Sequence, residues 1–297
     1  MEAYRKYLSP QVVSRLARMD LRARLVVEGF LTGLHESPYH GFSVEFAEHR
    51  PYGPGDPIRF IDWKVWGRTD RYYIKEYVEE TNLKAYLLMD ISASMGYSSN
   101  GLSKLEYGTY LAAALSYLML SQQDAVGLLV FDEVIRKYLP PKSVMGYLHP
   151  LLTELDGLKP GRGTDVSRVL HHLAERIKRR GLIILISDLF DDPERVMTGL
   201  KHFRHKKHEV IVFHVLDPQE RGFDFKRDGV FVDLETGERL TVQPWHIKRA
   251  YRELMGTFAD WYKRECRQHR IDYVLLDTAT DYDVALVQYL TKRKRIM

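Results

Sequence analysis

The sequence predicts a three-layer α/β/α domain of the Rossmann type, with a mostly parallel central sheet and an N-terminal helical and β extension. Short, continuously apolar runs predict strands buried on both faces, which is typical of parallel sheets (84–90, 124–131, 181–188 and 209–216). Segments with apolar residues at helical spacing alternate with these runs, which favours helices on both faces of the sheet. With 297 residues, 45% of them hydrophobic, the chain can bury such a core.

The predicted elements follow one another in a regular order. They are a strand at 84–90, a helix at 104–120, a strand at 124–131 with a short antiparallel partner at 134–139, helices at 145–155 and 166–177, a strand at 181–188, a helix opening at Asp192-Pro193, a strand at 209–216, a β-hairpin around Thr236-Gly237, a long helix over 247–262, a strand at 271–276 and a closing helix over 284–290. We therefore place the extension at 1–82 and the α/β domain at 83–297, with the hairpin as an insertion at about 217–243.

The extension contains two kinds of sequence pattern. Apolar residues at helical spacing after Ser9-Pro10 predict a packing helix, and alternating runs at 42–46 and 72–78 predict strands around a Gly/Pro-rich loop at 52–57. Charged and aromatic residues alternate between 56 and 70. They could form a binding surface or a network of ion pairs and hydrogen bonds that fixes an irregular segment, and we favour the network.

Composition limits the class of protein. No apolar run approaches the roughly 20 residues that span a bilayer, and the N-terminus lacks the apolar core of a signal peptide. The single cysteine, Cys266, fits a reducing compartment and continues the apolar stripe of its helix. The net charge of +4 is weak for a nucleic-acid binder. We expect a cytoplasmic protein with no membrane span, and we do not expect it to bind nucleic acid.

Oxygen-bearing side chains follow the predicted strands at one edge of the sheet. Asp90, Ser92 and Ser94 come at the end of the first strand, Asp188 ends the strand at 181–188, and Thr164 lies in the loop before a helix. Hard divalent cations bind such oxygens, and Mg²⁺ takes few carboxylates directly. We predict a Mg²⁺ site, with Mn²⁺ and Ca²⁺ as alternatives. Neutral hydroxyls leave the ion positive enough to accept a carboxylate from another molecule.

The pattern D-x-S-x-S, with a distant threonine and a distant aspartate, resembles the metal-ion-dependent adhesion site (MIDAS) of von Willebrand factor A domains. The resemblance implies a von Willebrand factor A-like fold. It also implies direct or near-direct ligation by hydroxyls and direct or water-mediated ligation by carboxylates (Ser92, Ser94 and Thr164; Asp90 and Asp188). The chain departs from the family at Leu189, where glycine is common, which puts the shape of that loop in question.

The segment GFSVEFAEHRPYGPGDPIRFIDW and the hairpin sequence DLETGERL are similar to the prokaryotic family called domain of unknown function 58. The resemblance covers nearly the whole chain from about Asp20. It implies a partner, an AAA+ ATPase of the MoxR type, and a chaperone-like role in assembly or maturation.

The expected function is a non-catalytic, metal-dependent protein-binding module, and the alternative is a metal-dependent hydrolase (phosphatase or nuclease). An aspartyl-phosphate mechanism would need a carboxylate at Ser92, and neither serine lies in a G-x-S-x-G elbow. No Walker A motif is present. A third possibility is that Asp90 and the serines only satisfy the backbone of their loop.

Histidines could in principle form a zinc site, since His202, His205 and His208 recur at intervals of three and His171-His172 are adjacent. Lysine and arginine surround the first group, which disfavours a cation. A solvated helix end is therefore the prediction for this group, and packing is the prediction for Cys266.

Overall fold

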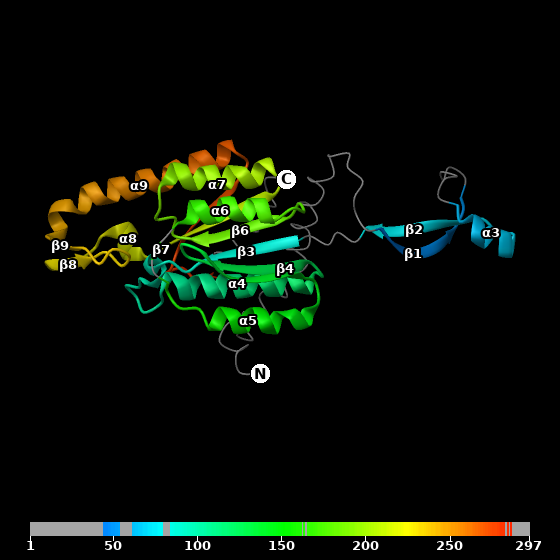
Figure 1. Ribbon diagram of the computed structural model, residues 1–297, viewed down its shortest axis with the longest axis horizontal. Coiled ribbons are helices and arrows are strands. Elements are labelled where there is room, and N and C mark those ends of the chain that lie inside the picture. Colours follow the sequence, from blue (N-terminus) through cyan, green and yellow to red (C-terminus); the bar gives the residue numbers. More distant parts are fainter. Residues whose placement is uncertain are drawn as a thin grey trace. The chain divides into compact units, whose positions relative to one another are not determined.

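The computed structural model describes residues 44–53, 61–79, 84–161, 163, 165–282, 284 and 286 (Figure 1). The chain divides into two compact units, Phe30–Asn82 and Met1–Gly29 together with Leu83–Met297. The predicted N-terminal helix and most of the predicted closing helix lie outside the described residues.

The smaller unit contains an antiparallel pair of strands. β1 (Val44–Pro51) pairs with β2 (Tyr73–Glu79), and α3 (Trp63–Thr69) lies between them in sequence. Asp62 caps α3, because its carboxylate accepts hydrogen bonds from two backbone N–H groups at the start of the helix. Asp62 thus has a structural role, whereas the alternatives for the charged and aromatic segment as a whole stay predictions.

The larger unit is built on a six-stranded sheet with the order β10-β7-β6-β3-β4-β5. The strands are β3 (Lys84–Asp90), β4 (Ala125–Phe131), β5 (Ile135–Lys142), β6 (Leu182–Ser187), β7 (Glu209–Leu216) and β10 (Asp272–Asp277). All neighbours are parallel except β4 and β5. The predicted, mostly parallel sheet with one antiparallel edge strand is confirmed.

Helices cover both faces of this sheet (Figure 1). They are α4 (Lys104–Ser121), α5 (Leu148–Asp156), α6 (Val166–Arg176), α7 (Pro193–His205), α8 (Pro218–Gly222) and α9 (Pro244–Gln268), with short 3-10 turns η2 (Ala93–Gly96) and η3 (Met145–Tyr147). α4 and α5 lie on one face, and α6 and α7 lie on the other. The three-layer α/β/α architecture is therefore confirmed.

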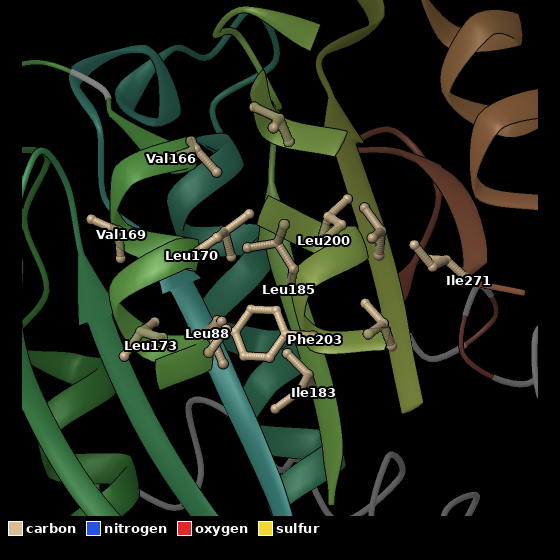
Figure 2. Packing of buried hydrophobic residues seen from close by; sticks show 14 of the residues in the cluster. Leu88, Val166, Val169, Leu170, Leu173, Ile183, Leu185, Leu200, Phe203 and Ile271 are labelled. Carbon is tan, nitrogen blue, oxygen red and sulfur yellow. The ribbon is translucent and has the colours of Figure 1, made fainter. Parts of the chain in front are cut away.

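The core between the sheet and the α6–α7 layer is packed with aliphatic and aromatic side chains. Figure 2 shows Leu88 and Leu185 of the sheet facing Leu170 of α6 and Phe203 of α7, and all four are fully buried. The two helices also approach each other closely at Gly199, where a Cβ atom would lie 2.8 Å from the Cβ of Leu170. Continuous burial explains why residues 85–89 of β3 and 182–186 of β6 are all apolar or aromatic.

Some element boundaries differ from the sequence-based expectation. The edge strand β5 runs on to Lys142 through Pro140 and Pro141, because a strand at the sheet edge can accommodate residues without an N–H donor. The helix expected at 145–155 begins with the 3-10 turn η3 before α5. Of the helices that the structure describes, none combines the length and the apolar character that crossing a membrane requires.

A β-hairpin lies between α8 and α9 in sequence. β8 (Gly229–Val232) pairs antiparallel with β9 (Arg239–Val242), and the connecting turn contains Gly237 at φ +75°. Phe231 of β8 stacks on Phe223 with ring centroids 5.3 Å apart, and Phe223 packs on Tyr251 of α9 at 4.4 Å. Aromatic contacts therefore attach the hairpin to α9.

Candidate metal-binding site

The sheet order places a change of winding direction at β3. From β3 the chain continues to β4 on one side, and the later strand β6 pairs on the other side. In open α/β sheets, ligands bind outside the carboxyl ends of the strands at such a switch point. Asp90 is the last residue of β3, and Asp188 directly follows β6. Two predicted ligands therefore stand at the position that the topology favours.

Asp90 is fully buried, and both of its carboxylate oxygens accept hydrogen bonds. Oδ1 accepts from the backbone N–H of Ser92 at 2.8 Å, and Oδ2 accepts from the hydroxyl of Ser187 at 2.6 Å. The hydroxyl oxygens of Ser92 and Ser94 lie 3.1 Å apart. The structure thus brings the three residues of the D-x-S-x-S pattern together. The loop is not extended throughout, because Ser94 lies in the 3-10 turn η2, but this turn keeps the two hydroxyls in contact.

Asp188 is also fully buried and lies close enough to Asp90 for their charges to interact. Its Oδ1 accepts from the backbone N–H of Phe190 at 3.3 Å, and its Oδ2 accepts from the ammonium of Lys104 at 2.7 Å. Burial and the negative charge of Asp188 raise the pKa of Asp90 to about 7, against the opposing hydrogen bonds from Ser187 and Ser92. A cation at this edge would relieve that repulsion.

Leu189 shows how the loop after β6 tolerates a residue other than glycine. Its backbone adopts the left-handed conformation at φ +57°, which ordinarily favours glycine. The N–H of Leu189 donates to the hydroxyl of Ser187 at 2.9 Å, and the leucine side chain is fully buried. Burial of the side chain offsets the conformational strain, so the backbone conformation that glycine readily adopts is kept at this position.

Lys104, the first residue of α4, is a member of the site that the sequence analysis missed. Its side chain is fully buried, and its ammonium also donates to Glu220 of α8 at 2.5 Å and lies 4.7 Å from the ring centroid of Phe190. Burial opposes the charged form, but Asp188 and Glu220 outweigh it and raise the pKa of Lys104. The sequence did carry one signal for this role, because Lys104 is a charged residue at the start of a helix that is otherwise mostly apolar.

Thr164 lies outside the described residues, so its predicted role as a ligand stays a prediction. The nearby Gly161 donates its N–H to the carbonyl of Ile91 at 2.5 Å, beside the D-x-S-x-S loop. A Cβ atom at Gly161 would lie 2.5 Å from Oδ2 of Asp132, so a larger residue would force the Asp132 side chain to shift. The loop that precedes α6 thus reaches the same edge of the sheet at Gly161.

The described residues fit an ion held mainly by hydroxyls and water. Asp90 accepts hydrogen bonds from Ser92 and Ser187, and Asp188 accepts them from Lys104 and Phe190. The remaining lone pairs of these four carboxylate oxygens can bind water or metal. Near them, one positive charge (Lys104) faces three negative ones (Asp90, Asp188 and Glu220). Within the part of the chain that the structure describes, no three His, Cys, Asp or Glu side chains form a metal-binding group. The predicted set contains only two carboxylates.

The histidines and the cysteine differ in burial and in their contacts. His208 is buried, with Nε2 3.2 Å from the carbonyl oxygen of Ile177, and burial lowers its pKa. The prediction of a solvated helix end is therefore wrong for His208, because the chain turns into the core after α7. The Nδ1 atoms of His171 and His202 lie 3.2 Å apart on the α6–α7 surface. Cys266 is fully buried, which confirms packing.

The chain is similar in sequence to mycobacterial proteins that are described as uncharacterized. The chain is 26% identical over 300 residues to the uncharacterized protein Rv1480 of Mycobacterium tuberculosis (strain ATCC 25618 / H37Rv), covering 96% of this chain and 91% of that protein. The uncharacterized protein Mb1516 of Mycobacterium bovis (strain ATCC BAA-935 / AF2122/97) matches with the same values.

Among solved structures, the conserved hypothetical protein BatB from Bacteroides thetaiotaomicron is 17% identical with a TM-score of 0.47, covering 72% of this chain and 99% of that one. An aerotolerance-related membrane protein from Bacteroides fragilis NCTC 9343 is 19% identical with a TM-score of 0.46, at 71% and 99% coverage. Residues 48–261 match the family described as "Protein of unknown function DUF58", and the chain therefore belongs to that family.

Proposed function

We propose that this protein is a non-catalytic, divalent-metal-dependent protein-interaction module with a MIDAS-like site at the carboxyl ends of β3 and β6. The observation that carries the proposal is the arrangement at the switch point: two buried carboxylates beside a pair of contacting hydroxyls. An acid/base pair for hydrolysis is missing from the D-x-S-x-S loop, because Ser92 stands where an aspartyl-phosphate mechanism needs its second carboxylate.

The ligand set of this proposal follows the resemblance to von Willebrand factor A domains. Ser92, Ser94 and Thr164 bind a Mg²⁺ ion, and Asp90 and Asp188 hold it directly or through water. The contact of Lys104 with Asp188 supports a water-mediated role for Asp188, because one of its oxygens is already engaged by an ammonium. Mn²⁺ and Ca²⁺ are alternative ions. The open coordination position then accepts a carboxylate from a partner protein.

A calorimetric titration of the whole chain with MgCl₂ tests the metal site. We expect binding by the wild type and at least about tenfold weaker binding by Ser94→Ala and Asp90→Ala, because each removes an oxygen close to the ion. Ser121→Ala is the matched control, since its hydroxyl bonds the carbonyl of Leu118 at the opposite end of α4. No binding by the wild type, or equal binding by all variants, contradicts the metal site.

The resemblance to the domain of unknown function 58 family adds a MoxR-type AAA+ ATPase as the partner to test. Such an ATPase uses Mg²⁺ with its nucleotide, so chelation alone is ambiguous. The decisive comparison is surface-immobilised wild type against Asp90→Ala, both in Mg²⁺, with the ATPase of the same genome in solution. We expect loss of binding in the variant while its fold, checked by circular dichroism, is retained. Equal binding would contradict a metal-bridged partner.

The hydrolase alternative has its own readout. Purified protein with Mg²⁺ should turn over neither p-nitrophenyl phosphate nor single-stranded or double-stranded DNA. Metal-dependent turnover that disappears in Asp90→Ala would replace the non-catalytic proposal with a hydrolase.

A further inference from the structure

The β8–β9 hairpin has an open edge along β8. Asp233 donates its N–H to the carbonyl of Glu238 at 2.9 Å, in register with the pairs that the hairpin forms. Hydrogen-bonded and non-hydrogen-bonded pairs alternate along an antiparallel ladder. Val230 and Val232 therefore occupy non-hydrogen-bonded positions, so their N–H and C=O groups point away from β9. Among the described residues, β8 pairs with β9 alone.

A groove of about 610 Å³ runs along this edge. Its lining comes from β8 and its flanking residues and from Tyr97, and no described residue of β9 contributes to it. The side chains of Val230 and Val232 are 57% and 48% exposed, and that of Leu234 is 51% exposed. Phe231, between the two valines, instead packs against Phe223 and Phe225. The groove thus offers backbone donors and acceptors beside uncovered aliphatic side chains.

The charge and position of the groove indicate what fits it. Two cationic residues, Lys226 and Arg227, line it against one carboxylate, Asp228. Tyr97 connects it to the candidate metal site, because its N–H donates to the carbonyl of Ser94 at 3.0 Å. The groove therefore borders the D-x-S-x-S loop through Tyr97.

We propose that the open edge of β8 captures an extended, acidic and apolar segment of a partner protein as an added third strand. Main-chain hydrogen bonds to Val230 and Val232 hold the segment, alternate apolar side chains cover the aliphatic residues, and an acidic side chain pairs with Lys226 or Arg227. The proposal rests on the proposed function in one respect: the same partner supplies the carboxylate to the cation. The strand pairing itself needs no metal.

The test uses a phage-displayed library of random dodecapeptides selected on the whole chain in EDTA and, separately, in Mg²⁺. We expect enriched peptides with apolar residues at alternate positions and at least one Asp or Glu in both selections. The best peptide is then synthesised with and without N-methylation at alternate residues. Methylation in the pairing register should weaken binding about tenfold or more, because each methyl removes a main-chain donor.

Proline substitution provides a matched pair of protein variants. Val232→Pro removes an N–H that points into the groove, and Thr241→Pro removes one that points away from β8 on the other edge of the hairpin. Neither N–H takes part in the β8–β9 ladder, so the hairpin should survive both changes. We expect about tenfold weaker peptide binding for Val232→Pro and wild-type binding for Thr241→Pro. Similar affinity in both variants overturns the proposal.

The outcomes separate this proposal from the metal site. Peptide binding in EDTA that Val232→Pro weakens supports β8 capture even if the MgCl₂ titration fails. Peptide binding that EDTA or Asp90→Ala abolishes but Val232→Pro leaves intact supports the metal site and contradicts β8 capture. Selection of peptides without alternation contradicts it as well. Dimerisation that Val232→Pro abolishes would assign the edge to a second copy of the chain instead.

Discussion

The ammonium of Lys104 lies 2.7 Å from Oδ2 of Asp188, and both side chains are fully buried. Lys104 opens α4 and Asp188 follows β6, so one ion pair joins the helix on one face of the sheet to the candidate metal site. Glu220 of α8 completes the group at 2.5 Å. Removing one member of such a group leaves buried charge without compensation.

Lys104→Met should therefore lower the free energy of unfolding by about 3–5 kcal/mol, because Asp188 and Glu220 lose their shared counter-charge. Urea denaturation at pH 7 measures the loss. The double variant Lys104→Met/Glu220→Gln removes one of the stranded charges and should recover part of it. A Lys104→Met protein as stable as the wild type would mean that water compensates the two carboxylates.

At Leu189, a glycine variant should be more stable than an alanine variant, which reverses the usual order. Both substitutions lose a fully buried leucine side chain and should destabilise the fold by about 2–5 kcal/mol. Leu189→Gly relieves the left-handed backbone strain and Leu189→Ala keeps it, so the glycine variant should be the more stable of the two by about 1 kcal/mol. Urea unfolding of the two proteins decides, and a more stable alanine variant would show that φ +57° costs little here.

His214, on β7, predicts a pH dependence of stability. It is fully buried, its Nδ1 lies 2.6 Å from the hydroxyl of Tyr273, and burial lowers its pKa to about 4. The unfolded chain takes up a proton near pH 6.5 and the folded chain only near pH 4, so stability is full above about 6.5 and is lost as the pH falls towards 4. The loss should approach about 3 kcal/mol.

The matched variants for this prediction are His214→Gln and Tyr273→Phe. Both lose the same hydrogen bond, but only Tyr273→Phe keeps the imidazole. Between pH 6.5 and pH 4.5, unfolding free energies of His214→Gln should therefore depend less on pH than those of the wild type, whereas Tyr273→Phe should keep the dependence. Equal pH slopes in the wild type and His214→Gln would show that other groups carry the effect.

The fold was predictable because continuously apolar strands such as β3 and β6 differ from amphipathic helices such as α6 in local sequence alone. The pairing of Lys104 was not, since its partners lie 84 and 116 positions away in the sequence. Local pattern likewise assigned His208 to a helix end, because the prediction grouped it with His202 and His205 of the helix rather than with the buried strand that begins at Glu209.

Of the predicted site residues, Asp90, Ser92 and Asp188 could be placed from the sequence because the carboxyl ends of neighbouring parallel strands share one edge. The involvement of Ser187 was not foreseen. Its hydroxyl contacts Asp90 only because β3 and β6 are adjacent in the sheet. Sequence patterns identify which strand ends carry oxygen atoms, but hydrogen bonds between two strand ends depend on their register.

The substitution Asp90→Asn tests how much the charge of Asp90 destabilises the folded protein when no metal is bound. Burial and the charge of Asp188 raise the pKa of Asp90 to about 7. Above that pH the folded chain carries the carboxylate of Asp90 in its charged form, which lowers the free energy of unfolding. In EDTA at pH 8, the asparagine variant should therefore unfold at a higher urea concentration than the wild type. At pH 4 this advantage should disappear, because Asp90 is then protonated in the folded protein.

Mg²⁺ should reverse the order at pH 8. If the ion binds at Asp90, excess Mg²⁺ stabilises the wild type by its binding free energy and leaves Asp90→Asn nearly unchanged. Ser116→Ala, which removes a buried hydroxyl bonded to Ala112 within α4, serves as the control that keeps the full response. An equal Mg²⁺ response in all three proteins would place the ion elsewhere. A wild type that is already the more stable protein in EDTA would show that hydrogen bonds from Ser92 and Ser187 outweigh the repulsion between Asp90 and Asp188.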